Sequence, residues 1–131
     1  MTRDPRTANA DDTIVEAARI MRDSDIGDVV IMQDGQVGGI LTDRDIVVRA
    51  IAEGRDPEAT PISEVCTTGV ETVDPSASVD DALRVMREAD IRRLPVVKNG
   101  RPVGIISLGD LAVERDPDST LADISAASPD Q

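Results

Sequence analysis

The sequence contains no aromatic residue and no histidine, and these two absences restrict its chemistry before any motif is considered. Without tryptophan, tyrosine or phenylalanine, a bound base has to lie against aliphatic side chains and backbone. Without histidine, the chain lacks the commonest general base and the commonest transition-metal ligand. Cys66 is the single cysteine. An intrachain disulfide and zinc-binding pairs of cysteines are therefore both excluded.

Basic residues are the minority among the charges, with 14 Lys and Arg against 26 Asp and Glu and a formal net charge of −12. Nucleic acids and anionic membrane surfaces are bound largely through Lys and Arg, so this balance argues against both as partners. No apolar run approaches the length needed to span a bilayer, and the N-terminal residues are charged rather than signal-like. We therefore expect a cytoplasmic protein.

The chain is an internal duplication, because a shift of 65 positions superposes residues 1–50 on residues 66–115 without a gap. Identical pairs include Ala17 with Ala82, Met21 with Met86, Asp25 with Asp90, Gly39 with Gly104 and Asp45 with Asp110. A repeat of about sixty residues buries too little apolar surface to be stable alone, so the copies should share a core. We predict a first repeat over residues 1–55, a linker and lead-in over 56–65, a second repeat over 66–118 and a tail over 119–131.

Each repeat predicts a helix, a β-hairpin and a second helix, which is an α/β (α+β) fold with a small sheet in each copy. The first helix should begin after Thr13 or Ser78, because an acid follows each hydroxyl by three positions and apolar residues then recur at helical spacing. The hairpins should span residues 29–41 and 94–106, with Asp34-Gly35 and Asn99-Gly100 as type I′ turns. The second helices should cover 43 to about 53, followed by Gly54, and 108 to about 115.

A hydroxyl residue followed by an aspartate three positions later recurs where each hairpin enters its second helix. The pairs are Thr42 with Asp45 and Ser107 with Asp110, and each follows a Gly-apolar-apolar stretch, Gly39-Ile40-Leu41 or Gly104-Ile105-Ile106. Each pair is explained locally as a capping box. The repetition of the whole neighbourhood indicates a second role for it.

Three features together resemble the CBS domain pair, or Bateman module. They are the two G-h-h-[ST]-x-x-D segments, in which h is apolar, the strand Leu94-Pro95-Val96-Val97, and the duplication itself. The resemblance covers nearly the whole chain and is nearest to small stand-alone bacterial CBS-pair proteins. It implies two α/β units packed about a pseudo-twofold axis, a homodimer, and two clefts that bind AMP, ADP, ATP or S-adenosylmethionine. It also implies a non-enzymatic regulatory module with no covalent cofactor and an unidentified protein partner.

The resemblance further implies which residues line the two clefts, each of which takes its motif from one repeat and a strand from the other. In one cleft, Ile40, Thr42 and Asp45 should face Ile91, Arg92, Arg93 and Leu94, with Val70 nearby. In the other, Ile105, Ser107 and Asp110 should face Ile26, Gly27, Asp28 and Val29. Each aspartate would accept hydrogen bonds from a ribose diol, as an acid does in dinucleotide folds. Because arginine suits phosphate and Asp28 would repel it, we expect the Asp45 cleft to be the better anion site.

Two other functions remain open from the sequence. The chain could be a structural or protein-interaction dimer whose capping boxes carry no ligand. An enzyme is disfavoured because general acid–base work would fall to carboxylates alone, and we predict no metal site although Asp43 and Asp45 could hold Mg²⁺ beside a nucleotide. Residues 120–124 look like the opening of a third repeat. We expect this tail to pack where the lead-in missing before Met1 would lie.

Overall fold

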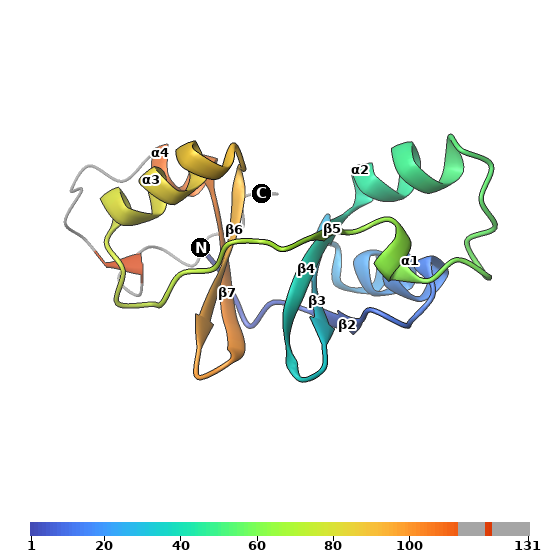
Figure 1. Cartoon of the computed structure of the whole chain (residues 1–131), viewed down its shortest axis with the longest axis horizontal. Coiled ribbons are helices and arrows are strands. Elements are labelled where there is room, and N and C mark those ends of the chain that lie inside the picture. The colour runs from blue at the N-terminus through green and yellow to red at the C-terminus, as the bar shows by residue number, and fades with distance from the viewer. Residues whose placement is uncertain (113–119, 122–131) are drawn as a thin grey trace. The chain divides into compact units, whose positions relative to one another are not determined.

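The computed structural model describes residues 1–112, 120 and 121, which form two compact units (Figure 1). We call Arg6–Val70 the first-repeat unit, and Met1–Pro5 with Glu71–Gln131 the second-repeat unit. In chain order the elements are β1 (Thr2–Arg3), β2 (Thr7–Asn9), α1 (Ile14–Ser24), β3 (Asp28–Gln33), β4 (Gln36–Thr42), α2 (Asp43–Asp45), a π-helix (Ile46–Ile51), a 3₁₀ helix (Ile62–Glu64), β5 (Thr67–Thr68), α3 (Val79–Ala89), β6 (Arg93–Lys98), β7 (Arg101–Ser107) and α4 (Leu108–Ala112).

Each unit is built on one small sheet, and Figure 1 shows each hairpin beside the helices of its own unit. The first-repeat unit has the strand order β2-β3-β4-β5, and the second-repeat unit has the order β1-β7-β6. Strand β2 runs parallel to β3, and the other pairs are antiparallel. The mixed helix and strand content with small sheets confirms the predicted fold class.

Each sheet contains a strand that belongs, by sequence, to the other repeat. Strand β5 opens the second repeat but pairs with β4, which places Thr67 opposite Ile40. Strand β1 opens the first repeat but pairs with β7, which places Thr2 opposite Ile105. The shift of 65 relates the two pairs, so the exchange is reciprocal. The compact units therefore differ from the repeats by an exchanged strand.

The first helix of each repeat begins at a complete capping box, as predicted. Thr13 accepts a hydrogen bond from the backbone N–H of Glu16, whose carboxylate accepts from the N–H of Thr13. Ser78 and Asp81 make the same reciprocal pair at the start of α3. These bonds satisfy backbone donors that the first turn of a helix leaves without partners. The predicted starts of both helices are confirmed.

The two hairpins turn through the left-handed region at both central residues, as a type I′ turn requires. Backbone φ is +54° at Asp34 and +78° at Gly35, and it is +53° at Asn99 and +78° at Gly100. The predicted turns are confirmed. Each hairpin also contains an irregularity that shifts the strand register. It lies between Ile31 and Met32 in the first hairpin and between Val96 and Val97 in the second.

The second helix of the first repeat differs from the single α-helix predicted over residues 43–53. It begins as α2 and continues as the π-helix Ile46–Ile51, in which the N–H of Ala52 donates to the carbonyl of Val47 over 2.9 Å. The apolar spacing of the sequence predicts a helix here but does not distinguish α-helical from π-helical hydrogen bonding. Gly54 follows with φ +72°, the left-handed conformation typical of a glycine just after a helix. Helix α4 covers Leu108–Ala112, and its predicted continuation to 115 lies outside the described residues.

Thr120 and Leu121 of the C-terminal tail contact the second-repeat unit beside the start of α3. Thr120 forms a bridge with Ser78, and the N–H of Leu121 donates to the carbonyl of Ala77 over 3.0 Å. The side chain of Leu121 is fully buried in the core of this unit. In the first-repeat unit the 3₁₀ helix makes the same contact, because Ile62 donates to the carbonyl of Asp12 over 2.8 Å. Leu121 therefore takes in this unit the place that Ile62 takes in the first-repeat unit, and the replacement of a lead-in stays a prediction. Residues 119 and 122–131 of the tail lie outside the described residues.

Within the described part of the chain, no helix is long and apolar enough to cross a membrane.

Candidate functional site

The repeated hydroxyl–aspartate motif forms a second pair of capping boxes, at the junctions of β4 with α2 and of β7 with α4. Thr42 Oγ1 accepts from the backbone N–H of Asp45 over 3.1 Å, and Asp45 Oδ2 accepts from the N–H of Thr42 over 3.0 Å. The corresponding distances between Ser107 and Asp110 are 3.1 and 2.8 Å. The local interpretation of the motif is confirmed in both repeats. Each box uses only one of the two carboxylate oxygens.

The second carboxylate oxygen of each motif faces a cationic group. Asp45 Oδ1 lies 3.8 Å from Nε of Arg49, and Asp110 Oδ1 lies 3.5 Å from the amino group of Met1. Both carboxylates are largely buried, with side-chain exposures of 15% and 8%. Sequence reasoning missed Arg49, although it stands four residues after Asp45, the spacing at which side chains on a helix pair.

A backbone hydrogen bond fastens each motif helix to the chain just before the first hairpin strand. The N–H of Asp43 donates to the carbonyl of Gly27 over 3.0 Å, and the N–H of Leu108 donates to the carbonyl of Arg92 over 2.8 Å. The shift of 65 again relates the two bonds. Each motif is thus held against residues 26–28 or 91–93 of its own repeat.

The strand register places a charged residue directly opposite each motif hydroxyl. Asp28 pairs with Thr42, and Arg93 pairs with Ser107. Directly opposed residues on neighbouring strands present their side chains on the same face of the sheet. The two motifs therefore have opposite charges beside them, an acid in the first-repeat unit and a base in the second-repeat unit.

We call the two groupings half-sites, and each lies within one compact unit. Half-site 1 comprises Ile26, Asp28, Val29, Ile40, Thr42 and Asp45, with Val70 at the end of the same unit. Half-site 2 comprises Ile91, Arg92, Arg93, Leu94, Ile105, Ser107 and Asp110. The structure thus brings together the motif and strand of the same repeat, and the expected pairing of each motif with the other repeat stays a prediction.

The apolar members of the half-sites are mostly buried, whereas their charged members reach the surface to different degrees. Val29 and Leu94 are fully buried, and Ile40 and Ile105 are 8% and 3% exposed. Arg92 is exposed, Arg93 is half-buried and Asp28 is 9% exposed. The half-sites therefore combine aliphatic surface with carboxylate, hydroxyl and guanidinium groups.

Cys66 lies next to β5 in the first-repeat unit and is 8% exposed, as a small buried residue. Burial raises the pKa of its thiol, and the negative charge of Asp45 raises it further. A raised pKa keeps the thiol neutral and opposes thiolate chemistry. Across the described residues, no group of three or more Asp, Glu, Cys or His side chains could hold a metal ion.

The duplicated helix–hairpin–helix units and their paired motifs define a tandem α/β module of a known class. The CBS domain family model matches residues 1–51 and 62–115, and the chain belongs to this family. It is 43% identical over 115 residues to CBS domain-containing protein YhcV of Bacillus subtilis, covering 88% of this chain and 81% of that one. It is 40% identical over 102 residues to Hypoxic response protein 1 of Mycobacterium tuberculosis, covering 77% of this chain and 71% of that protein.

A solved structure is similar over nearly the same span. The crystal structure of Hypoxic Response Protein I with two coordinated zinc ions superposes with a TM-score of 0.72 at 37% identity, covering 86% of this chain and 92% of that one. The predicted CBS pair is therefore confirmed, and the protein is a member of a family of regulatory modules.

Proposed function

We propose that this chain is a non-enzymatic sensor that binds an adenosine-containing ligand through its two motifs and passes the bound state to a partner protein. The observation that carries the proposal is the same in both half-sites. Asp45 and Asp110 each use one carboxylate oxygen in a helix cap and leave the other outside the cap.

The second oxygens of these carboxylates suit the ribose of such a ligand. A carboxylate can accept from both hydroxyls of a cis-diol, as an acid does in dinucleotide-binding folds. A hydrogen bond to a charged group contributes about 1.5 to 3 kcal/mol, which corresponds to a roughly ten- to hundredfold difference in affinity. Thr42 and Ser107 would add a hydroxyl beside each carboxylate.

The adenine base would pack against aliphatic side chains, because the chain has no aromatic residue. The apolar side chains that remain partly exposed for this packing are Ile26 and Val70 in half-site 1 and Ile91 in half-site 2. Packing between aliphatic groups gives weaker selectivity among bases than hydrogen bonding does. We therefore expect the ribose to contribute more to recognition than the base.

Arg92 and Arg93 are the proposed phosphate-binding groups. The resemblance to CBS pairs assigns them to the cleft of Asp45, whereas the strand register places Arg93 beside Ser107 of its own repeat. The two assignments predict that different variants lose the preference for a phosphorylated ligand. If the arginines serve Asp45, Asp45→Asn abolishes the preference for AMP over adenosine, and if they serve Ser107, Asp110→Asn does so.

The proposal is tested by thermal unfolding of the whole chain with adenosine, AMP, ADP, ATP and S-adenosylmethionine, with 2′-deoxy-AMP, which lacks one hydroxyl of the ribose diol, as the control. A ligand at a hundredfold its Kd stabilises the folded state by about 2.7 kcal/mol. We expect at least one adenosine compound to raise the Tm, and Arg92→Gln with Arg93→Gln to reduce the response to AMP more than that to adenosine. Equal Tm values with every compound would favour the alternative, a protein-interaction dimer with no nucleotide.

Homodimerisation forms part of the proposal, because the resemblance to CBS pairs implies it. In a dimer, a ligand bound to one chain can change the surface that the dimer presents to the partner protein. Sedimentation of the whole chain with and without AMP tests this step. A monomer under both conditions would contradict it.

A further inference from the structure

A small hollow of the second-repeat unit lies between α3 and the segment that precedes it. Its volume is about 190 Å³, which is room for roughly six water molecules. The residues that line it are Glu71, Val85, Glu88 and Ala89. Val85 is half-buried and the other three are exposed, so the hollow has an aliphatic floor and two carboxylates at its rim. We call it the α3 hollow.

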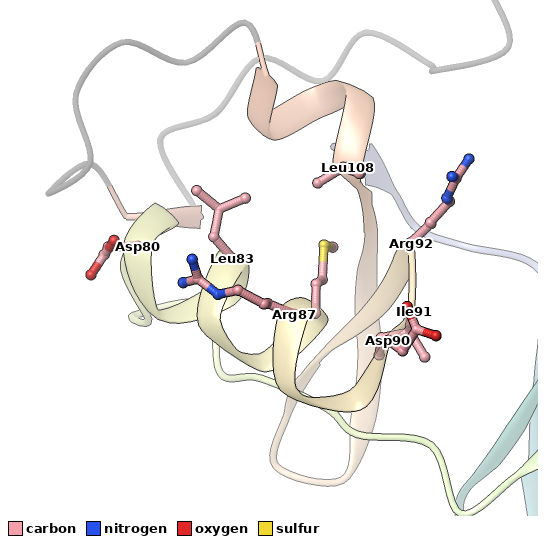
Figure 2. Close-up of a pocket in the computed structure, with 8 residues that line it drawn as sticks. Asp80, Leu83, Arg87, Asp90, Ile91, Arg92 and Leu108 are labelled. Carbon is pink, nitrogen blue, oxygen red and sulfur yellow. The ribbon is translucent and has the colours of Figure 1, made fainter.

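The α3 hollow is separate from the larger groove between α3 and α4 of the same unit. Figure 2 shows Leu83 and Arg87 of α3 lining that groove together with Leu108 of α4. Because an α-helix turns about 100° per residue, Val85 and Glu88 project from the other side of α3. The two hollowed surfaces therefore use opposite faces of one helix.

The first repeat fills the equivalent place with a guanidinium group of its own. The shift of 65 aligns Glu71 with Arg6 and Ala89 with Ser24. Nε of Arg6 donates to Oγ of Ser24 over 3.2 Å, so the arginine side chain crosses from the leading segment to the end of α1. The second repeat has neither partner of this hydrogen bond. The α3 hollow is therefore equivalent to a place where the first repeat holds an arginine side chain.

The remaining lining of the hollow is the same in kind in both repeats. The shift of 65 aligns Val85 with Ile20, and both are half-buried aliphatic side chains. It also aligns Glu88 with Asp23, so each repeat has an acid on its helix here. The second repeat thus keeps the floor and the acid, and it has a second carboxylate where the first repeat has its guanidinium.

The two carboxylates of the hollow have no cation of their own. In the part of the chain that the structure describes, the ion pairs include neither Glu71 nor Glu88. The equivalent acid of the first repeat, Asp23, pairs with Arg22 over 2.8 Å. Like charges beside one hollow repel each other. A cation placed between them is attracted by both.

A guanidinium group suits this hollow better than an ammonium group does. It is planar, its N–H groups match carboxylate oxygens, and it is hydrated weakly enough to pack against other side chains. The aliphatic stem of an arginine can also cover apolar surface such as that of Val85. Arg6 provides the example within this fold, because its guanidinium is accommodated at the equivalent place.

We propose that the α3 hollow binds an arginine side chain of a partner protein. The guanidinium donates to the carboxylates of Glu71 and Glu88, and the stem of the arginine packs on Val85. This inference goes beyond ligand sensing, because it uses no residue of either half-site. It stands whether or not an adenosine compound binds to the chain.

The charge of the chain favours an arginine within a protein over the free amino acid. The formal net charge is −12, so the α-carboxylate of free arginine is repelled where its guanidinium is attracted. An arginine inside a peptide has no such carboxylate. Further basic residues beside it would be attracted by the same field. We therefore expect the partner to present a basic segment.

Titration of the whole isotope-labelled chain with acetyl-Gly-Arg-Gly-amide, followed by NMR, tests the proposal. We expect the amide signals of Val85, Glu88 and Ala89 to shift and to saturate with a Kd of about a millimolar, the strength of roughly two charge-assisted hydrogen bonds. The citrulline peptide has nearly the same shape without the charge and should bind at least about tenfold more weakly. Equal binding of the two peptides, or tighter binding of free arginine, would overturn the proposal.

A matched pair of variants locates the site. Glu88→Gln removes one charge from the hollow, and Glu58→Gln removes the same charge from an exposed position in the first-repeat unit. We expect Glu88→Gln to weaken binding of the arginine peptide about tenfold and Glu58→Gln to weaken it less than about twofold. Equal weakening by both would overturn the proposal, because it would show a general attraction to an acidic chain.

A transplant of the first repeat's own hydrogen bond gives a second test. Glu71→Arg combined with Ala89→Ser introduces into the second repeat the pair that Arg6 and Ser24 form in the first. The internal guanidinium should fill the hollow and abolish binding of the peptide, while urea unfolding shows an intact fold. Unchanged binding would overturn the proposal. The response of each variant to AMP, measured separately, reports on the ligand-sensing function.

Discussion

Arg49 links Asp45 to the segment that precedes the exchanged strand β5. Its Nε lies 3.8 Å from Asp45 Oδ1, and its Nη1 donates to the carbonyl of Val65 over 3.3 Å. Any ligand that bonds to Asp45 Oδ1 must share that oxygen with Arg49. In the proposed function, a ligand at Asp45 would therefore be connected through the Arg49 side chain to residues 65–68, where the second repeat opens.

Thr42→Ala should weaken both the fold and ligand binding, because the Thr42 hydroxyl caps α2 and belongs to half-site 1. Loss of an N-cap costs about 0.5 to 2 kcal/mol of stability. Thr13→Ala removes an equivalent cap from α1, outside both half-sites, and is the matched control. Urea unfolding and AMP titration should show a stability loss in both variants and an affinity loss in Thr42→Ala alone. Equal affinities in the two variants would contradict the assignment.

Leu121→Ala should destabilise the second-repeat unit by about 2 to 5 kcal/mol, the usual cost of emptying a fully buried leucine site. Leu121→Met keeps most of the volume and should cost less than about 1.5 kcal/mol. Urea unfolding of the two variants and the parent chain measures both effects. If Leu121→Ala lost no more stability than Leu121→Met, the side chain of Leu121 would not be packed in the core of the second-repeat unit.

Gly39→Ala should separate β5 from β4. A Cβ at this position would collide with the backbone carbonyl of Thr67, which cannot move without breaking the strand pair. Overpacking of this kind costs about 1 to 3 kcal/mol. Gly109→Ala is the control, because the nearest atom to its added Cβ is Ser107 Oγ at 3.6 Å, and it should be neutral or stabilising by up to about 1 kcal/mol. Similar melting temperatures for both variants would argue against close packing of β5.

The Cys66 thiol should make the fold less stable in alkali. Burial raises its pKa, so the folded state prefers the neutral thiol. The resulting stability is present below the thiol's unfolded pKa and is lost as the pH rises through the folded value. Urea midpoints measured from pH 7 to 10.5 should fall more steeply for the parent chain than for Cys66→Ala. The absence of tyrosine removes one competing titration from this range. Parallel curves for the two proteins would refute the prediction.

Local features of this fold were predictable from sequence because each depends on a few neighbouring residues. Thr13 with Glu16 defines a capping box by its spacing alone. Asp34-Gly35 defines a type I′ turn because both residues tolerate a positive φ. The same reasoning found Thr42 with Asp45, the centre of half-site 1.

The strand register and the exchange were beyond local reasoning. The irregularity after Ile31 moves the register by one residue, so that Thr42 stands opposite Asp28 instead of Gly27. The second hairpin shifts in the same way, which places Arg93 opposite Ser107. Strands β1 and β5 pair with residues far away in the sequence, and no local pattern specifies such a partner.

Calorimetric titration of AMP tests the central claim, that the motif carboxylates bind the ligand, most directly. Asp45→Asn and Asp110→Asn are compared with Glu16→Gln and Asp81→Asn, which alter equivalent capping boxes outside the half-sites. We predict that the Asp45 and Asp110 variants each weaken binding at their own half-site roughly ten- to hundredfold, while the controls stay within about threefold of the parent chain. Unchanged affinity in both Asp45→Asn and Asp110→Asn would contradict the account.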